Sequence, residues 1–261
     1  MNSLKKHYFF SDVHLGMRPS IEEKERELKL VSFLESIRGD AEKIYIVGDL
    51  FDCWIEYRKV VPKGYFRTLA KLSEITGQGI EVHFFSGNHD FWLNTYLHDE
   101  VGLILHYDKL ATEIEGKRFY ITHGDGLSKG DLGYKIIKKL LRSRFNQFLY
   151  SLVHPDLGIW LAQKSSNTSR HANDEKFFGG TGMQEFAESK VKEGFDYVIM
   201  GHFHRPQTIE INNGSHKGYY ITLGDWIKNY TYGEFFDGKF DIKTFPDPEH
   251  SGMGLINRIF F

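Results

Sequence analysis

The chain has 261 residues, 41% of them apolar and 26% charged, which is enough to bury one large core or one core with a modest appended subdomain. Its formal net charge of −2 supplies no overall basic field for non-specific nucleic-acid binding, so neither DNA nor RNA is an expected partner. The single cysteine, Cys53, excludes an intramolecular disulfide framework, and residues 1–6 lack the apolar stretch of a secretory signal, which together predict a cytoplasmic protein.

The N-terminal part of the chain predicts strands that alternate with helices. Short runs of strand-forming residues at 7–11 and 43–47 flank the segment 21–37, where apolar residues recur at helical spacing. A second helix is expected over 65–75 and a further strand over 80–85. This order is typical of crossover units, in which the carboxyl ends of parallel strands meet at one edge of the sheet.

The C-terminal part predicts hairpins. Residues 109–122 form an expected hairpin around Gly116, and a single strand is expected at 197–200. Successive antiparallel strands are then expected at 208–211, 218–223, 232–237 and 239–245. The mixture of crossover units and hairpins fits an α/β protein with two stacked mixed sheets flanked by helices.

Short polar motifs follow the predicted strands. In chain order they are Asp12-Val13-His14, Gly48-Asp49-Leu50-Phe51-Asp52, Gly87-Asn88-His89-Asp90, His123-Gly124-Asp125 and Gly201-His202-Phe203-His204. Oxygen and imidazole donors without thiolates suit a pair of divalent ions such as Mn²⁺, Zn²⁺ or Mg²⁺. Two such ions, roughly 3.5–4 Å apart, activate an attacking oxygen and neutralise phosphoryl charge. A lone Asp-x-His pair is usually structural, but all these motifs together predict a phosphoesterase.

The residue types indicate which residues bind each ion and which one acts as the general acid. Asp12 and His14 are one residue apart, so in an extended segment both side chains can face one ion. Asp49 has two carboxylate oxygens and can bridge both ions, while the Asn88 amide oxygen can reach the second. His89 is the candidate general acid, because it would lie beside the ions and could donate a proton to the departing oxygen. The alternative is a loop histidine without a catalytic role.

Residues 127–176 interrupt the alternation of strands and helices. An amphipathic helix is expected over 135–152, with one apolar face and one basic face. Pro155 and Gly158 are expected to end it before a second apolar segment. We interpret the insertion as a helical lid over the metal site, with packing of the apolar stripe onto the main domain as the alternative. Its apolar runs are too short to span a bilayer, so any membrane contact is expected to be peripheral.

The order of the motifs resembles that of the calcineurin-like metallophosphoesterase superfamily over most of the chain. The resemblance implies a four-layer α/β/β/α sandwich formed by residues 1–126 and 177–261, with the lid at 127–176. It implies one metal ion bound by Asp12, His14, Asp49 and His204. It implies a second ion bound by Asp49, Asn88, His123 and His202.

Within that superfamily the chain is more similar to the UDP-2,3-diacylglucosamine pyrophosphatases of lipid A biosynthesis, which are manganese-dependent and carry a helical lid. The supporting segments include 131–134, 169–176 and 201–206. The resemblance implies two divalent ions, with Mn²⁺ expected, and hydrolysis of the lipid-linked UDP-sugar to lipid X and UMP at the cytoplasmic face of the inner membrane. The catalytic residues that it implies are Asn88 and His89. The substrate-binding residues that it implies are Asn88, His89, Asp131, Tyr134, Ser169, Asn173, Lys176 and His202.

One position departs from that pattern. The better-known members carry Arg where this chain has His89, which is the commoner residue in the superfamily. A second hypothesis therefore keeps the metal ions and gives the site another phosphodiester or nucleotide as substrate. A third, a non-catalytic protein-binding scaffold, is disfavoured because scaffolding needs neither the ligand set nor His89.

Overall fold

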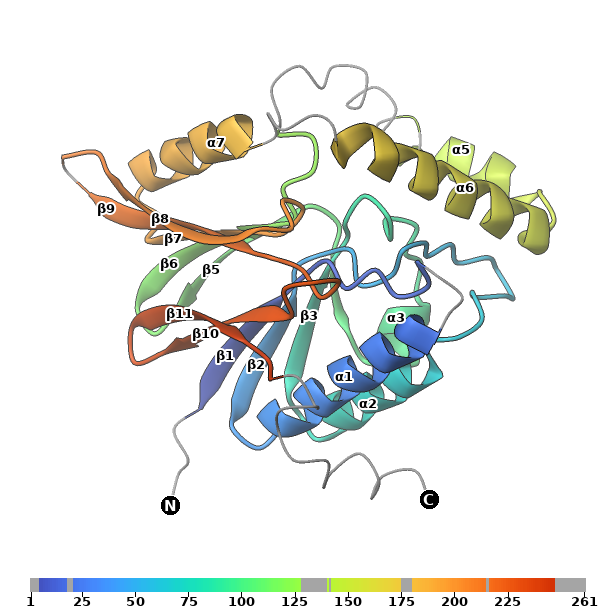
Figure 1. Ribbon diagram of the computed structural model, residues 1–261, viewed down its shortest axis with the longest axis horizontal. Coiled ribbons are helices and arrows are strands. Elements are labelled where there is room, and N and C mark those ends of the chain that lie inside the picture. Colours follow the sequence, from blue (N-terminus) through green and yellow to red (C-terminus); the bar gives the residue numbers. More distant parts are fainter. Residues whose placement is uncertain are drawn as a thin grey trace.

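A computed structural model describes residues 5–17, 21–127, 140, 142–174, 180–214 and 216–246. Two β-sheets lie face to face in this part of the chain, and helices cover the outer face of each (Figure 1). The layers follow the order α/β/β/α, as predicted. No described helix is both long enough and apolar enough to cross a membrane.

The first sheet contains the crossover units. Its strands lie in the order β11-β10-β1-β2-β3-β4. The parallel strands are β1 (Lys6–Phe10), β2 (Ala41–Ile46), β3 (Glu81–Phe85) and β4 (Ile104–His106). The helices between them are α1 (Ile21–Ile37), α2 (Phe66–Gly77) and the short α3 (Tyr96–Asp99). The predicted strands and the two longer helices are confirmed, whereas α3 and β4 were not predicted.

The second sheet has the order β5-β6-β7-β9-β8. Its strands are β5 (Lys109–Ile114), β6 (Lys117–Thr122), β7 (Tyr197–Met200), β8 (Pro206–Asn212) and β9 (Lys217–Leu223). Helix α7 (Gly180–Lys192), which was not predicted, packs on the outer face through β7 and β9. The predicted hairpin of β5 and β6 is confirmed.

The core shows why β1 carries aromatic residues in succession. Neighbouring side chains in a strand point to opposite faces of the sheet. Phe10 packs with the helices on one face, where its ring lies 5.7 Å from that of Phe33. Phe9 faces the second sheet, stacking on Tyr45 at 4.6 Å and on Phe119 at 6.0 Å. Because β1 is buried on both faces, an apolar run replaces the alternating pattern of a half-exposed strand.

The predicted series of antiparallel strands is wrong at one joint. β9 pairs with β7, whereas β10 (Thr231–Phe236) pairs with β1 in the other sheet and with β11 (Lys239–Thr244). The chain changes sheets through residues 224–230, where the buried Trp226 donates its backbone amide to the carbonyl of Asp12. Periodicity reports which face of a strand is buried and does not report its partner.

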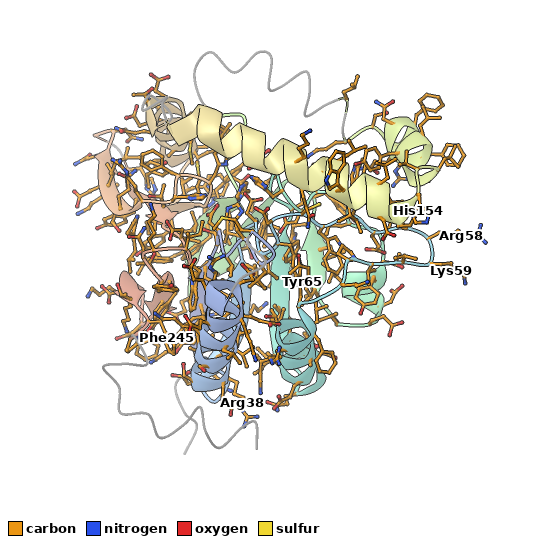
Figure 2. All side chains as sticks on the ribbon, turned by 45° about the vertical axis from the view of Figure 1, so that its right-hand side comes forward. Arg38, Arg58, Lys59, Tyr65, His154 and Phe245 are labelled. Atoms are coloured by element: carbon orange, nitrogen blue, oxygen red, sulfur yellow. The ribbon has the colours of Figure 1, made fainter. Side chains whose placement is uncertain are left out.

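The described part of the insertion contains the helices α5 (Arg144–Ser151) and α6 (Pro155–Asp174), at one end of the molecule (Figures 1 and 2). The prediction of one helix over 135–152 is corrected, since Ser143 is extended and α5 begins after it; residues 135–139 and 141 lie outside the described part. The predicted break at Pro155 is confirmed, since α5 ends at Ser151 and Pro155 begins α6, where the first position needs no amide hydrogen. Gly158 lies inside α6, where a Cβ would be 1.9 Å from the Tyr57 hydroxyl.

Candidate metal centre

The motifs lie in the loops that follow β1, β2, β3, β6 and β7, and backbone hydrogen bonds hold these loops together. The amide of Asp12 donates to the carbonyl of Gly48 at 3.1 Å, and the amide of His14 donates to that of Asp49 at 3.0 Å. The side chains of Asp12, His14 and Asp49 are buried. The edge of the first sheet therefore brings together the motifs after β1, β2 and β3, as the crossover pattern predicts, and the motifs after β6 and β7 come from the second sheet.

Positive φ angles concentrate at the predicted metal ligands. They are Asp12 (55°), His14 (50°), Asp49 (53°), His202 (64°) and His204 (52°). Residues with a Cβ avoid this left-handed region, and the surrounding structure must hold them there. The prediction that Asp12 and His14 lie in an extended segment is therefore wrong. Two left-handed residues flank Val13, and their side chains still reach the same site.

Glycines in the motifs make room for ligand side chains. A Cβ on Gly87 would lie 2.0 Å from Oδ1 of Asp49, and a Cβ on Gly48 would lie 2.3 Å from Nδ1 of His123. Any larger residue at either position would displace a predicted ligand. The glycine before Asp49 thus serves the packing of His123 as well as the turn.

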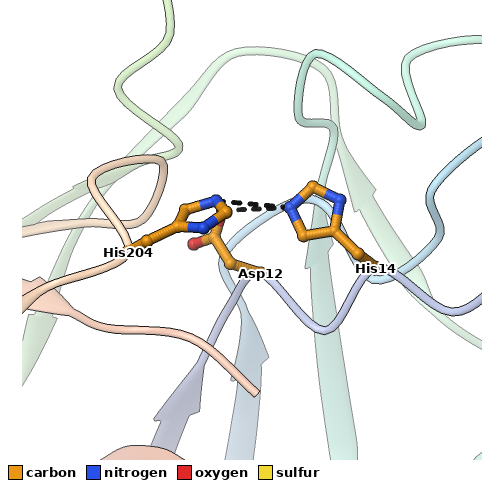
Figure 3. A group of neighbouring side chains, drawn as sticks. All are labelled: Asp12, His14 and His204. Atoms are coloured by element: carbon orange, nitrogen blue, oxygen red, sulfur yellow. Dashed lines mark hydrogen bonds and ion pairs between the residues drawn. The ribbon is translucent and has the colours of Figure 1, made fainter. Parts of the chain in front are cut away.

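The first group of ligand atoms comes from Asp12, His14 and His204 (Figure 3). Oδ1 of Asp12 lies 3.2 Å from Nε2 of His204 and 3.8 Å from Nε2 of His14. Oδ2 accepts the amide of His202 at 2.9 Å, whereas the buried Oδ1 has no hydrogen-bond partner among the described residues. A buried carboxylate oxygen facing imidazole nitrogens fits a divalent cation.

The second group comes from Asp49, His123 and His202, whose ligand atoms lie within 4.8 Å of one another. Nε2 of His123 lies 3.3 Å from Oδ2 of Asp49 and 3.2 Å from Oδ1 of Asn88. Nδ1 of His123 hydrogen-bonds the carbonyl of Val47 at 2.9 Å, and this bond orients the ring so that Nε2 faces the site. Amide, carboxylate and imidazole donors again fit a borderline-to-hard ion.

His89 lies beside both groups. Its amide donates to Oδ1 of Asp49 at 2.9 Å, and Nδ1 lies 3.1 Å from the carbonyl of Asp52. Its ring stands at 85° to that of His14, with the centroids 4.8 Å apart. A third group with metal-ligand spacing consists of His14, Asp49 and His89, so the geometry also allows His89 to contact an ion.

Two further aspartates support the loops. Oδ1 of Asp52 lies 3.3 Å from Nδ1 of His14 and orients that ring. Asp90 is fully buried and accepts the amides of Gly87 at 2.8 Å, Asp49 at 3.3 Å and Phe51 at 3.2 Å. Asp90 thereby joins the loop after β3 to the loop after β2.

Burial and neighbouring charged groups shift the pKa values of the site histidines. Burial opposes protonation of His14, but the neighbouring carboxylates of Asp12 and Asp52 outweigh it and raise the pKa of His14 to about 10. Burial likewise opposes protonation of His123, yet the charge of Asp49 raises its pKa to about 10. Burial and the neighbouring His123 lower the pKa of His202 to about 4. Without a cation, protons therefore occupy part of the ligand set.

Asp225 and Asn229 support the His204 loop and were not predicted from the sequence. Oδ1 of Asp225 accepts the amides of Ile227, Lys228 and Asn229 at 2.7–3.1 Å. Nδ2 of Asn229 donates to the carbonyl of His204 at 2.9 Å. The signal was present, because Gly224-Asp225 follows β9 just as the other motifs follow their strands.

The structure brings together all seven predicted metal ligands and His89. The predicted substrate residues Asp131, Tyr134 and Lys176 lie outside the described residues. Ser169 and Asn173 fall within α6, but their side chains are outside the described part.

The sequence model of the calcineurin-like phosphoesterases matches residues 6–206. A UDP-2,3-diacylglucosamine hydrolase from Porphyromonas gingivalis is 36% identical over 245 residues, covering 87% of this chain and 92% of that protein. Proteins of the same name from Haemophilus influenzae and Photorhabdus laumondii are 30% and 31% identical; the matches cover 87% and 91% of this chain and 93% and 98% of theirs.

Proposed function

This chain belongs to the calcineurin-like phosphoesterase family, and on that premise we propose that it hydrolyses the pyrophosphate of UDP-2,3-diacylglucosamine with two divalent ions, giving 2,3-diacylglucosamine 1-phosphate and UMP. One water molecule is consumed, and the bond between one phosphorus and the bridging oxygen breaks. The observation that carries the two-ion site is the position of Asp49. Its Oδ2 lies 3.7 Å from Nε2 of His14 and 3.3 Å from Nε2 of His123, between the two ligand groups.

The ligand sets follow from that arrangement. Asp12, His14, Asp49 and His204 hold one ion, and Asp49, Asn88, His123 and His202 hold the other. We propose Mn²⁺ in both positions. When bound, two such ions would neutralise phosphoryl charge and lower the pKa of the attacking water.

The chain's own groups then act on the substrate. His89 donates a hydrogen bond or proton to the departing or non-bridging phosphoryl oxygen, and the amide oxygen of Asn88 beside it would be a ligand of the second ion. Nδ1 of His89 lies 3.1 Å from the carbonyl of Asp52, and on this proposal Nε2 is the nitrogen that acts on the substrate. On the same proposal, Asp131, Tyr134, Ser169, Asn173 and Lys176 of the lid hold the glucosamine and phosphate groups.

The inserted helices support a substrate with acyl chains. Their large apolar side chains are 41–69% exposed, at Leu140, Phe145, Phe148, Leu149, Leu152, Leu157, Trp160 and Leu161. Packing of this stripe onto the main domain therefore does not account for it. Among the described residues, Tyr150 packs on the main domain, where its ring lies 4.4 Å from that of Trp92. A nucleotide alone would not need such a surface.

The same surface suits peripheral contact with the cytoplasmic face of the inner membrane. The exposed Arg58 and Lys59 lie near His154 at one end of the inserted helices (Figure 2). Apolar side chains next to cations favour an interface that contains anionic lipid headgroups. The acylated substrate would be taken from that interface.

The test is Mn²⁺-dependent release of UMP from UDP-2,3-diacylglucosamine, beside a chromogenic phosphodiester as control. We expect UMP release that stops on chelation and returns with Mn²⁺. Cleavage of the control alone would keep the two-ion chemistry and assign the site to another phosphodiester or nucleotide. Cleavage of neither would contradict the proposal.

A further inference from the structure

Arg142, just before α5, reaches from the insertion to the loops that carry Asn88 and His123. Its Nη1 donates to the carbonyl of Tyr107 at 2.9 Å, and its Nη2 donates to the carbonyl of Gly87 at 3.2 Å. Nη2 also lies 3.8 Å from Oδ2 of Asp125. Only about a quarter of the Arg142 side chain is exposed.

The contact with Gly87 bears directly on Asn88. A peptide unit is planar, so the carbonyl of Gly87 and the amide of Asn88 turn as one rigid group. Asp90 accepts the amide of Gly87 on one side of this residue, and Arg142 donates to its carbonyl on the other. These two bonds restrict the direction in which the Asn88 side chain leaves the backbone, toward Nε2 of His123 at 3.2 Å.

The contact with Asp125 bears on the other loop. Asp125 is 5% exposed in its side chain and follows His123 by two residues. One guanidinium group therefore lies against two of the loops that supply the second ion site, those of Asn88 and His123. A planar group with several fixed donors suits this task, whereas an ammonium group is a single point of charge.

We propose that Arg142 is a positioning residue, which holds the Asn88 loop against the His123 loop. The position of the inserted helices thereby affects the geometry of the second ion site. The inference rests on the metal site of the proposed function and is independent of the lipid substrate. Arg142 itself does not need to touch an ion or a phosphate group.

The experiment measures Mn²⁺ binding to the full-length chain by calorimetry, with Arg142→Ala, Arg142→Lys and Arg144→Ala beside the wild type. Arg144→Ala is the matched control, because Arg144 is exposed and its substitution removes one positive charge from the same segment. We expect Arg142→Ala to bind one of the two ions with an affinity lower by about 10-fold or more, because loss of a group that orients metal ligands has an effect of this size. Arg142→Lys should lie between Arg142→Ala and the wild type, and Arg144→Ala should match the wild type.

A second readout separates positioning from general structural damage. Turnover of a small chromogenic phosphodiester, which has no acyl chains, should fall in Arg142→Ala and recover partly on addition of guanidinium ion at non-denaturing concentration. Arg144→Ala should not respond to guanidinium. If Arg142→Ala does not fold, Arg142→Gln takes its place under the same criteria, since it keeps one amide donor.

Wild-type affinity for both ions in Arg142→Ala would overturn the inference, and so would an equal loss in Arg144→Ala or the absence of guanidinium rescue. Failure of the wild type itself to bind two Mn²⁺ ions would instead overturn the proposed function. The two failures are therefore distinguishable in one titration series.

Discussion

The side-chain amide of Asn229 donates a hydrogen bond to the backbone carbonyl of His204 at 2.9 Å, and so holds a proposed metal ligand in a left-handed conformation. The same amide lies 3.1 Å from Oδ2 of Asp225, which fixes its direction. His204 is more exposed than the other ligands of its group, so its geometry depends on this bond more than on packing.

Asn229→Ala should therefore weaken binding of the ion held by Asp12, His14 and His204, by roughly 10-fold if it resembles other groups that orient ligands. Titration of the apoprotein with Mn²⁺ measures this. Lys228→Ala, at the exposed neighbouring position, is the control. Equal affinities in Asn229→Ala and wild type would show that His204 keeps its place unaided.

His123→Ala should lower turnover by about 100-fold or more. The substitution removes a proposed metal ligand, and losing a ligand should reduce activity more than losing a group that only orients a ligand. The chain should remain folded, since the buried sheets of the core do not depend on this side chain. Circular dichroism and turnover of a chromogenic diester check both points. His154→Ala, at a side chain that is 74% exposed, is the matched control. Undiminished turnover would remove His123 from the site.

His89→Gln should reduce kcat by roughly 10²- to 10⁴-fold, the range that general acid catalysis contributes. Metal affinity should change little, because the proposed role of His89 is toward the substrate. Parallel measurement of kcat and Mn²⁺ affinity separates this role from that of a ligand. A loss of affinity as large as the loss of kcat would place His89 on an ion, as the group of His14, Asp49 and His89 allows.

Metal uptake should release protons near pH 8. Asp12, Asp52 and Asp49 hold the pKa values of His14 and His123 at about 10, so both rings are protonated in the apoprotein, while an ion needs them neutral. Affinity should therefore rise as the pH rises toward 10. Calorimetric titrations in buffers of different ionisation enthalpy measure the protons released. Identical heats in all buffers would contradict these pKa values.

The same pKa values predict the stability of the apoprotein. An unfolded histidine has a pKa of about 6.5, so a folded-state value of about 10 adds stability that is fully present below pH 6.5. This contribution is lost as the pH rises through 10. Thermal unfolding in the presence of a chelator should therefore show a falling Tm from pH 7 to pH 10, and a Tm that rises over this range would refute the assignment.

Phe145→Ser together with Phe148→Ser should raise KM for the diacylated substrate and leave turnover of a small diester unchanged. Burying one such ring is worth about 1.5–3 kcal/mol, so a loss of about 10-fold or more per ring is expected if acyl chains cover it. Phe66→Ser is a fitting control, because Phe66 is 77% exposed and belongs to α2, which is not part of the insertion. An unchanged KM would remove these rings from the substrate path.

The sequence predicts the site well where chemistry follows a strand. Asp12, Asp49 and Asn88 each come after a buried strand of the expected order, and the parallel strands β1, β2 and β3 bring their loops to one edge of the first sheet. His123 also follows a buried strand, β6 of the second sheet. The left-handed backbone at Asp12 and His14 was missed, because it arises from hydrogen bonds with the Gly48 loop that only the folded chain contains.

Other features depend on partners that are distant in the chain. The pairing of β10 with β1 is not visible in the alternation of residues 231–236, which would suit either sheet. Arg142 reads in sequence as one of several cations on a basic helix face. Its contacts with Gly87 and Tyr107 lie 55 and 35 residues away, and no local pattern distinguishes it from Arg144.

The most direct test of the two-ion site is anomalous diffraction from crystals grown with Mn²⁺. We predict two peaks on either side of the Asp49 carboxylate, about 3.5–4 Å apart, with Asp12, His14 and His204 around one and Asn88, His123 and His202 around the other. A single peak, or two peaks that do not share Asp49, would contradict the account.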